Sequence, residues 1–432
     1  MLLFKYLPAK IIKFVKVNPI AARYIADGFF IAFATSIAIN NYNLFAMRLG
    51  ADEFQLSLIQ FLPQIFTMLV LIPGGLLMDS LRNKKRIVII MLVVVMLGYL
   101  FCVLSPYAGS YSIAFFLGSL SFAGAALALH NIAWQSFFPT VVDLTNRNYV
   151  LTLRTRIFLF ISMIAPLLTG IILACIRSLN GKIIAHQIFF IVSILVFLLA
   201  IFNFNKFRRS RSIVPKRITL PEIKRSFASL SRNKPFLMFA AVALFFHATW
   251  HFDWTLYFIS QVNYLHMNEF QLGLAPLGAA AIQLLTLKFW SRKNEKHGVV
   301  LPFTFGILGL SLCPVFMIVA VSLPPSLGPH LFVVLHIIAH IPFATITLNL
   351  FQCLLLVVDE ENRSLSMSVF ACLICLSNAV MPVAGITLYR ALGGDLNGLR
   401  YAFAIIFALR IAAALLWLLR WRLTIAKQVV LK

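Results

Sequence analysis

The densest group of chemically capable side chains lies in the apolar stretch 236–259, within the run HATWHFDW. At about 100° per residue, two imidazoles and two indoles share one face of a helix there: His247, Trp250, His251 and Trp254. Such a face can stack a planar organic molecule or hold a cation. Asp253 lies on its flank and is a candidate proton carrier. The alternative is that a neighbouring group neutralises Asp253 for packing alone.

Three other apolar stretches carry polar residues that could line the same path. They are Asn40 in 25–47, His130, Asn131 and Trp134 in 112–137, and His336 and His340 in 330–355. Polar side chains in a membrane helix are functional candidates. They also serve as hydrogen-bonding contacts between helices, worth about 0.6 kcal/mol each. Both interpretations stay open for each residue.

Two histidine pairs, His247/His251 and His336/His340, have the i,i+4 spacing that can bind one metal ion. A histidine-rich membrane metalloenzyme is therefore an alternative to a solute pathway. Against it, the nine histidines include no adjacent pair, and the sequence contains no HExxH. We expect no enzyme activity, no bound metal and no cofactor.

The elements that must position these residues are membrane helices. The chain is 61% hydrophobic and 12% charged, against about 45–50% and about 25% in soluble domains. Apolar runs of about 20 residues are long enough to cross a bilayer. Twelve such spans are predicted: 25–47, 56–77, 86–105, 112–137, 156–176, 186–204, 236–259, 271–290, 299–320, 330–355, 367–389 and 400–419.

The distribution of the 37 basic residues sets the predicted topology. With both termini inside, 31 of them fall in inner segments and five in outer loops, as the positive-inside rule requires. The net charge of +24 therefore indicates contact with an anionic inner leaflet and not with nucleic acid. Asp27, near the inner end of the first span, is expected to be within reach of the headgroups. Arg410 lies deep in the last span with no evident partner.

The chain is also a tandem repeat with an offset of 216 residues. EFQLSL at 53–58 recurs as EFQLGL at 269–274, and VVDLTNR at 141–147 recurs as VVDEENR at 357–363. Six spans per repeat leave both halves in the same orientation, so the repeats are parallel and related by an axis along the membrane normal. We predict an N-terminal segment 1–24, a six-helix bundle 25–204, a basic linker 205–235, a second bundle 236–419 and a tail 420–432, with linker and both ends cytoplasmic.

A glycine, an aspartate and a basic turn follow the second span, and the residues are Gly75, Asp79, Arg82 and Lys84. This segment resembles the loop between helices 2 and 3 of the major facilitator superfamily, and Glu295 marks a weaker copy at the repeat offset. The resemblance implies twelve transmembrane helices in two pseudo-symmetric six-helix bundles. It also implies that spans 1, 4, 7 and 10 line a central path and that the loop acts as a latch. Asp79 could instead only neutralise the basic turn.

The pairs Asp143/Arg147 and Asp359/Arg363 also recur at the repeat offset and are candidates for gating. A simple ion pair at this i,i+4 spacing is the alternative, and it is worth only about 0.2–0.5 kcal/mol.

The function predicted from the resemblance and the polar spans is secondary active transport of a small organic solute by alternating access. Protons are the candidate coupling ion, efflux is favoured over uptake, and a monomer in the cell membrane is expected. The alternatives are a transporter-like receptor or scaffold that moves nothing, and the histidine-box metalloenzyme.

Overall fold

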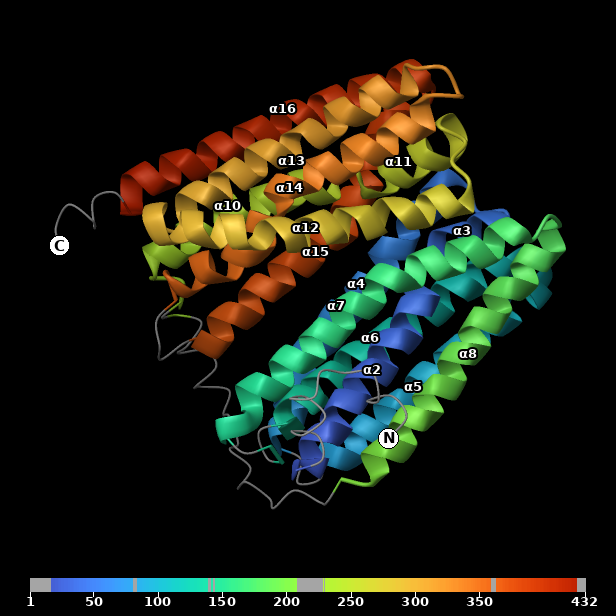
Figure 1. The fold of residues 1–432 in the computed structure, drawn as a ribbon, viewed down its shortest axis with the longest axis vertical. Helices are drawn as coiled ribbons and strands as arrows, with labels where there is room; N and C mark the ends of the chain where they lie inside the picture. The colour runs from blue at the N-terminus through green and yellow to red at the C-terminus, as the bar shows by residue number, and fades with distance from the viewer. Residues whose placement is uncertain are drawn as a thin grey trace. The chain divides into compact units, whose positions relative to one another are not determined.

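A computed structural model describes residues 17–80, 84–138, 141–142, 144–207, 228, 230–358 and 363–425, and every regular element in these ranges is helical (Figure 1). The first half contains α2 (Pro19–Ile39), α3 (Tyr42–Arg48), α4 (Glu53–Ser80), α5 (Lys84–Leu104), η2 (Ser105–Tyr111), α6 (Ser112–Phe137), α7 (Leu144–Cys175) and α8 (Leu179–Asn205). The second half contains α10 (Lys234–His251), α11 (Trp254–Ile259), η4 (Ser260–Tyr264), α12 (Glu269–His297), α13 (Val300–Val321), α14 (Gly328–Leu355), α15 (Arg363–Ala391), α16 (Leu396–Arg420) and η5 (Trp421–Ile425).

Eleven stretches of the described chain are long and apolar enough to cross a membrane. One of them, Lys84–Gln135, contains both α5 and most of α6, so the stretches agree with the twelve predicted spans. The expectation of an all-helical, multi-span membrane protein is confirmed.

The helices form two compact units. Unit 1 comprises residues 1–49, 69–169 and 177–217, and unit 2 comprises 50–68, 170–176 and 218–432. In unit 1, α5 packs against α6 and α8, and α8 packs along α2. In unit 2, α13 packs against α14 and α16, while α10 packs against α15 and α16.

The repeated stretch at 53–58 and 269–274 has a local structural cause, because it begins a helix in the same way each time. The backbone N–H of Gln55 donates to Asp52 Oδ1 at 2.7 Å, and the N–H of Asp52 donates to Gln55 Oε1 at 2.9 Å. Asn268 and Gln271 make the same two bonds at 2.8 and 3.1 Å. Each pair is a capping box that satisfies otherwise unbonded donors at a helix start. The duplication therefore preserves the beginnings of α4 and α12.

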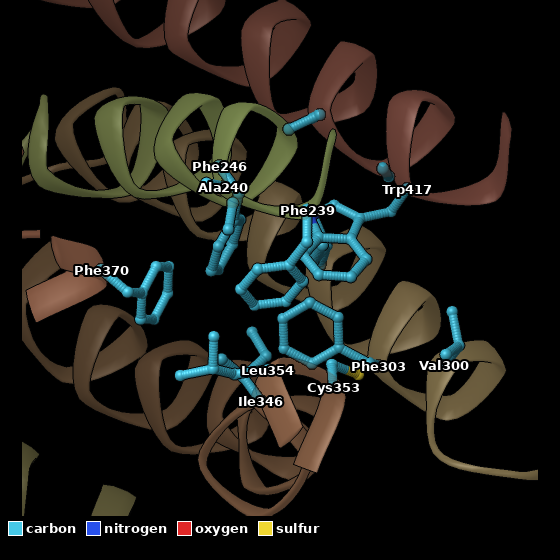
Figure 2. Packing of buried hydrophobic residues seen from close by; sticks show 14 of the residues in the cluster. Phe239, Ala240, Phe246, Val300, Phe303, Ile346, Cys353, Leu354, Phe370 and Trp417 are labelled. Carbon is cyan, nitrogen blue, oxygen red and sulfur yellow. The ribbon is translucent and has the colours of Figure 1, made fainter. Parts of the chain in front are cut away.

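Aromatic side chains build the core of each unit. In unit 1 the fully buried Tyr24 ring packs edge to face against Trp134 and Phe138, which stack on each other, with centroid distances of 5.5 and 5.1 Å. In unit 2 the rings of Phe239, Phe303 and Trp417 meet, as Figure 2 shows, with Trp417 4.6 Å from Phe303 and 5.8 Å from Phe239. Edge-to-face contacts of this kind add to the free energy of burial. They hold α10, α13 and α16 together around the polar residues of α10.

The first and seventh spans are each broken into a long and a short helix. The predicted spans 25–47 and 236–259 agree with the apolar stretches Pro19–Arg48 and Lys234–Tyr264, although each stretch contains a break. One helix ends at Ile39 and resumes at Tyr42, and the other ends at His251 and resumes at Trp254. Neither break contains glycine or proline. At the first break, the side-chain amides of Asn40 and Asn41 donate to Ser36 O and Ile37 O at 2.7 and 3.1 Å and so compete with the helix, whereas tertiary contacts hold the second break.

Candidate functional site

The break between α10 and α11 is the centre of the polar site in unit 2, and an arginine fills it. Arg410 of α16 reaches into the break with its guanidinium, and Nη2 lies 2.7 Å from Asp253 Oδ2. The two side chains are only 1% and 2% exposed. A buried ion pair is tolerated only when further hydrogen bonds satisfy the remaining donors, and here three of the four remaining N–H groups are bonded.

Those further bonds go to backbone carbonyls. Arg410 Nε donates to Thr249 O at 3.3 Å and Nη2 donates to Trp250 O at 3.2 Å. Nη1 donates to Leu310 O of α13 at 3.1 Å. Carbonyls in the last turn of a helix have no partner within the helix and carry the negative end of its dipole. Arg410 therefore caps the end of α10 and compensates the charge of Asp253 at the same time.

Gly385 of α15 closes the other side of the break. A Cβ added there would overlap the carbonyl oxygen of Phe252. The backbone of α15 thus approaches the break more closely than any residue with a side chain would allow. Helices α13, α15 and α16 together fix the direction in which α10 ends.

The predicted stripe of imidazoles and indoles forms on one face of α10 and α11, in two layers. His247 and His251 are buried, with ring centroids 5.2 Å apart, and His251 Nδ1 lies 3.1 Å from Ser377 Oγ. Neither ring nitrogen of His247 has a hydrogen-bond partner among the described residues. Trp250 and Trp254 are half-buried, and their rings meet edge to face at 6.0 Å. The indoles are therefore the accessible layer and the imidazoles the covered one.

The predicted histidines of α14 continue this aromatic surface through one further ring. Phe343 lies 5.2 Å from Trp250 and 5.3 Å from His340, centroid to centroid. His336 and His340 are half-buried and 4.4 Å apart, and His340 Nδ1 lies 2.7 Å from the carbonyl oxygen of His336. Sequence reasoning missed Phe343, whose type alone does not distinguish it from the many other phenylalanines.

In unit 1 the structure gathers a second charged group around Trp134. Trp134 Nε1 donates to Asp27 Oδ2 at 3.0 Å, and the guanidinium carbon of Arg154 lies 3.6 Å from the centroid of the Trp134 ring. Arg154 Nη2 is 4.0 Å from Asp27 Oδ2. Asp27 is 0% exposed, so the expectation that it reaches the headgroups is wrong, because Trp134 and Arg154 cover it.

The other predicted pathway residues of unit 1 do not all join this group. His130 is fully buried on α6, one turn before Trp134, whereas Asn131 is exposed on the same helix. Asn40 lies at the end of α2, where its side chain donates to Ser36 O at 2.7 Å. Asn40 therefore caps its own helix at the break.

The gating residues lie mostly where the structure gives no side-chain information, so their roles stay predictions. Arg82, Asp143 and Asp359 are outside the described residues, and the backbones of Gly75, Asp79, Arg147 and Arg363 are helical. Lys84 begins α5. Glu295 is exposed near the end of α12.

Arg410 and Arg154 are the charged residues whose partners sequence reasoning did not identify. The pairing of Arg410 with Asp253 could have been inferred from the sequence, because a deep arginine and a deep aspartate in the same half of the chain each require a partner. Arg154 precedes the predicted span 156–176 by two residues, but α7 begins at Leu144, so the helix carries Arg154 into the unit.

The arrangement offers stacking surfaces and hydrogen-bonding groups and no metal centre. Among the described residues, no three His, Cys, Asp or Glu side chains come together to hold a metal ion. The accessible indoles and Phe343 suit a planar solute, and the charged pairs provide carboxylates whose charge could change during a transport cycle.

The sequence and the fold both resemble those of known proteins. The family model for the Major Facilitator Superfamily matches residues 28–352, and no curated protein sequence matches significantly. The bacterial homologue of the human lysosomal transporter Spinster, inward-facing and occupied, aligns with a TM-score of 0.70 and 13% identity over 95% of this chain and 97% of that one. A bacterial homologue of the iron transporter ferroportin, inward-facing, gives 0.69 and 12% over 93% and 98%. The nucleoside transporter NupG gives 0.67 and 9% over 93% and 99%. At these low identities, the TM-scores show a shared fold.

Proposed function

This chain belongs to the major facilitator superfamily, and from that premise we propose that it moves a small planar organic solute by alternating access. A secondary transporter needs no enzymatic site, so the metalloenzyme alternative falls away. The similar structures are of a nucleoside transporter and of bacterial homologues of an iron transporter and a lysosomal transporter, and at this level of identity they do not favour one substrate.

The observation that carries the proposal is the accessible aromatic surface of Trp250, Trp254, Phe343 and His340 beside a buried charged group. Stacked rings provide a large contact area at low cost in side-chain entropy. The half-buried imidazole of His340 can hydrogen-bond to a heteroatom on the edge of a solute. Pockets for organic molecules combine these two features, with apolar walls and a few placed polar groups.

Protons are the proposed coupling ion, and Asp253 is the first carboxylate to test. A proton on Asp253 would remove the charge that Arg410 compensates, and the end of α10 would lose part of its support. Transport by an Asp253→Asn variant should then lose the pH dependence of the wild type. Unchanged pH dependence in that variant would remove Asp253 as the carrier.

The proposed setting is the cell membrane, with both termini cytoplasmic, efflux as the favoured direction and a monomer as the working unit. The bias of basic residues supports this topology. The proposed latch of Gly75, Asp79, Arg82, Lys84 and Glu295, with the pairs Asp143/Arg147 and Asp359/Arg363, would lie on the cytoplasmic side.

The experiment is a thermal-shift screen of small organic molecules on the detergent-purified protein, at about pH 5.5 and about pH 8. A ligand at 100 times its Kd stabilises the folded state by about 2.7 kcal/mol. We expect planar aromatic solutes to raise the unfolding temperature, and a Trp250→Ala/Trp254→Ala variant to lose the effect. Leu284→Ala, on the exposed surface of α12, is the matched control.

The outcome that contradicts the proposal is equally specific. Stabilisation by divalent metal ions, reversed by a chelator and absent in a His247→Ala/His251→Ala variant, would identify a metal-ion substrate instead. A receptor or scaffold that moves nothing would bind a hit in detergent, but proteoliposomes containing it would not accumulate or release that hit.

A further inference from the structure

Arg154 is an incompletely bonded guanidinium, and this sets it apart from the other arginine that is paired with a buried aspartate. Its contacts are the face of Trp134 and a 4.0 Å approach of Nη2 to Asp27. Its buried Nε has no hydrogen-bond partner among the described residues. A guanidinium has five N–H donors in a planar fork, so most of the hydrogen-bonding capacity of Arg154 is unused.

The groups around Arg154 are also incompletely bonded. Asp27 Oδ1 and the Tyr24 hydroxyl are buried without a partner in the described part of the chain. Both residues lie one turn apart on α2, on the side that faces Trp134. Buried polar atoms without partners are rare, and each calls for a bound water, ion or ligand group.

The charged atoms of this pair differ in accessibility. The side chain of Arg154 is 22% exposed, whereas that of Asp27 is 0% exposed. A solute that approaches the pair therefore meets the cation and not the carboxylate. Gly28 leaves room for this arrangement, because a Cβ there would overlap Arg154 Cγ.

We propose that Arg154 binds an oxyanion of the transported solute, a carboxylate or a phosphate, in place of Asp27. The planar fork of a guanidinium matches these groups with two parallel N–H···O bonds. This inference rests on the proposed function, since it names the polar end of the same class of small organic solute.

Charge balance ties the binding of the oxyanion to a proton. One guanidinium compensates one negative charge in a site of low dielectric constant. When the oxyanion takes that charge, Asp27 remains buried as an uncompensated carboxylate, and one proton from solution converts it to the neutral acid. No other bond forms or breaks. Binding of one oxyanion therefore takes up one proton, and release of the solute returns it.

The groups that face Asp27 leave it as the site of that proton. Its own helix presents Tyr24, α6 presents Trp134 and, one turn earlier, His130, and α7 presents Arg154. Helix α8 packs along α2 and carries no ionisable residue between Ser193 and Asn203. The Trp134 Nε1–H is a donor only and is bonded to Asp27 Oδ2, so the proton goes to Oδ1, which has no partner among the described residues.

The test uses matched pairs of probes that share a ring and differ in charge, on the full-length protein in detergent. The pairs are benzoate with benzamide, indole-3-acetate with indole-3-acetamide, and phenyl phosphate with phenol. Unfolding temperature is titrated against each probe at several pH values to give Kd. Arg154→Gln removes the proposed cation. Arg156→Gln is the control, because Arg156 is an exposed basic residue on the same helix.

We expect at least one oxyanion to bind at least tenfold more tightly than its neutral counterpart, and Arg154→Gln but not Arg156→Gln to abolish the difference. The Kd of the oxyanion should rise about tenfold per pH unit where one proton is taken up. Asp27→Asn should bind the oxyanion more tightly and without this pH dependence, a gain that misfolding cannot produce. The carboxylate and phosphate arms distinguish the two kinds of oxyanion.

Three results would overturn the inference in different ways. Neutral probes that bind as tightly as the oxyanions, with loss in the Trp250→Ala/Trp254→Ala variant, leave the proposed function standing and exclude the role of Arg154. Oxyanion binding that survives Arg154→Gln places the anion elsewhere. Absence of any shift with all six probes contradicts the proposed planar solute as well.

Discussion

Each unit of the molecule buries one aspartate beside one arginine, yet the two pairs are bonded very differently. Asp253 and Arg410 are 2.7 Å apart and almost fully buried. The remaining donors of Arg410 reach three carbonyl oxygens. Asp27 and Arg154 are 4.0 Å apart, and Arg154 remains 22% exposed. The same two residue types thus form a structural support in one unit and an unsaturated, accessible cation in the other.

The helix breaks explain this difference. The Asp253–Arg410 pair lies at the end of α10, where backbone carbonyls are free to accept hydrogen bonds. Asp27 lies within α2, 12 residues before its end at Ile39, and the carbonyls there are used by the helix itself. Among the described residues, Arg154 therefore finds one carboxylate and one ring, and no backbone acceptor. The position of a helix break relative to the aspartate therefore decides whether backbone carbonyls are available to the N–H donors of the paired arginine.

The largest expected effect comes from removing the saturated cation. Arg410→Leu leaves Asp253 buried without its counter-charge and three carbonyls without donors. We expect the free energy of unfolding to fall by about 3–5 kcal/mol, measured by equilibrium unfolding in mixed micelles.

The double variant Arg410→Leu/Asp253→Leu provides the control for that prediction. It removes both charges, so it should be more stable than Arg410→Leu alone. A double variant as unstable as the sum of the single variants would show that the two residues do not act as a pair.

A smaller effect is expected from the glycines that give room to each pair. Gly385→Ala places a Cβ against the Phe252 carbonyl, which is backbone and cannot move aside. We expect a loss of about 1–3 kcal/mol. Gly28→Ala meets the aliphatic part of Arg154, a side chain that can shift, so its loss should be smaller. Equal losses in the same unfolding assay would contradict the distinction between a fixed and an adjustable pair.

The fold was accessible from the sequence because hydropathy, charge bias and the repeat all depend on local composition. The helix breaks could not be predicted from the sequence, because neither contains glycine or proline. What sustains the α10–α11 break is Arg410, 157 residues away in the chain. A long-range contact of this kind does not change the spacing of apolar and polar residues along α10, so the sequence of α10 alone does not reveal it.

The candidate site was recovered only in part, for the same reason. The stripe from His247 to Trp254 was predicted from helical spacing, and in the structure these side chains lie on one face. Asp27 was placed near solvent because its position along α2 was read without Trp134 and Arg154, which come from two other helices. Pairing across helices depends on rotation and depth, and neither is contained in a hydropathy pattern.

Removing the unsaturated cation should cost much less than removing Arg410. Arg154→Gln loses a cation–π contact with Trp134 and a long ion contact, and it leaves no backbone carbonyl without a donor. Asp27 loses its counter-charge, but it can take up a proton as proposed above, so that no buried charge stays uncompensated. We expect a decrease of about 1 kcal/mol in the free energy of unfolding. Arg156→Gln, on the exposed surface of α7, should change it by less than about 0.5 kcal/mol. A loss near that of Arg410→Leu would mean that Arg154 is also a structural support.

The smallest effect is expected for Asp27→Asn, and it separates the two pairs most directly. The asparagine oxygen can still accept from Trp134 Nε1, and the lost attraction to Arg154 acts over 4.0 Å toward a partly exposed cation. The free energy of unfolding should change by less than about 1 kcal/mol. Asp253→Asn leaves Arg410 buried with no negative partner and should lose several times more. If the two asparagine variants unfold alike, the pairs are equivalent supports, and the unused donors of Arg154 have no functional meaning.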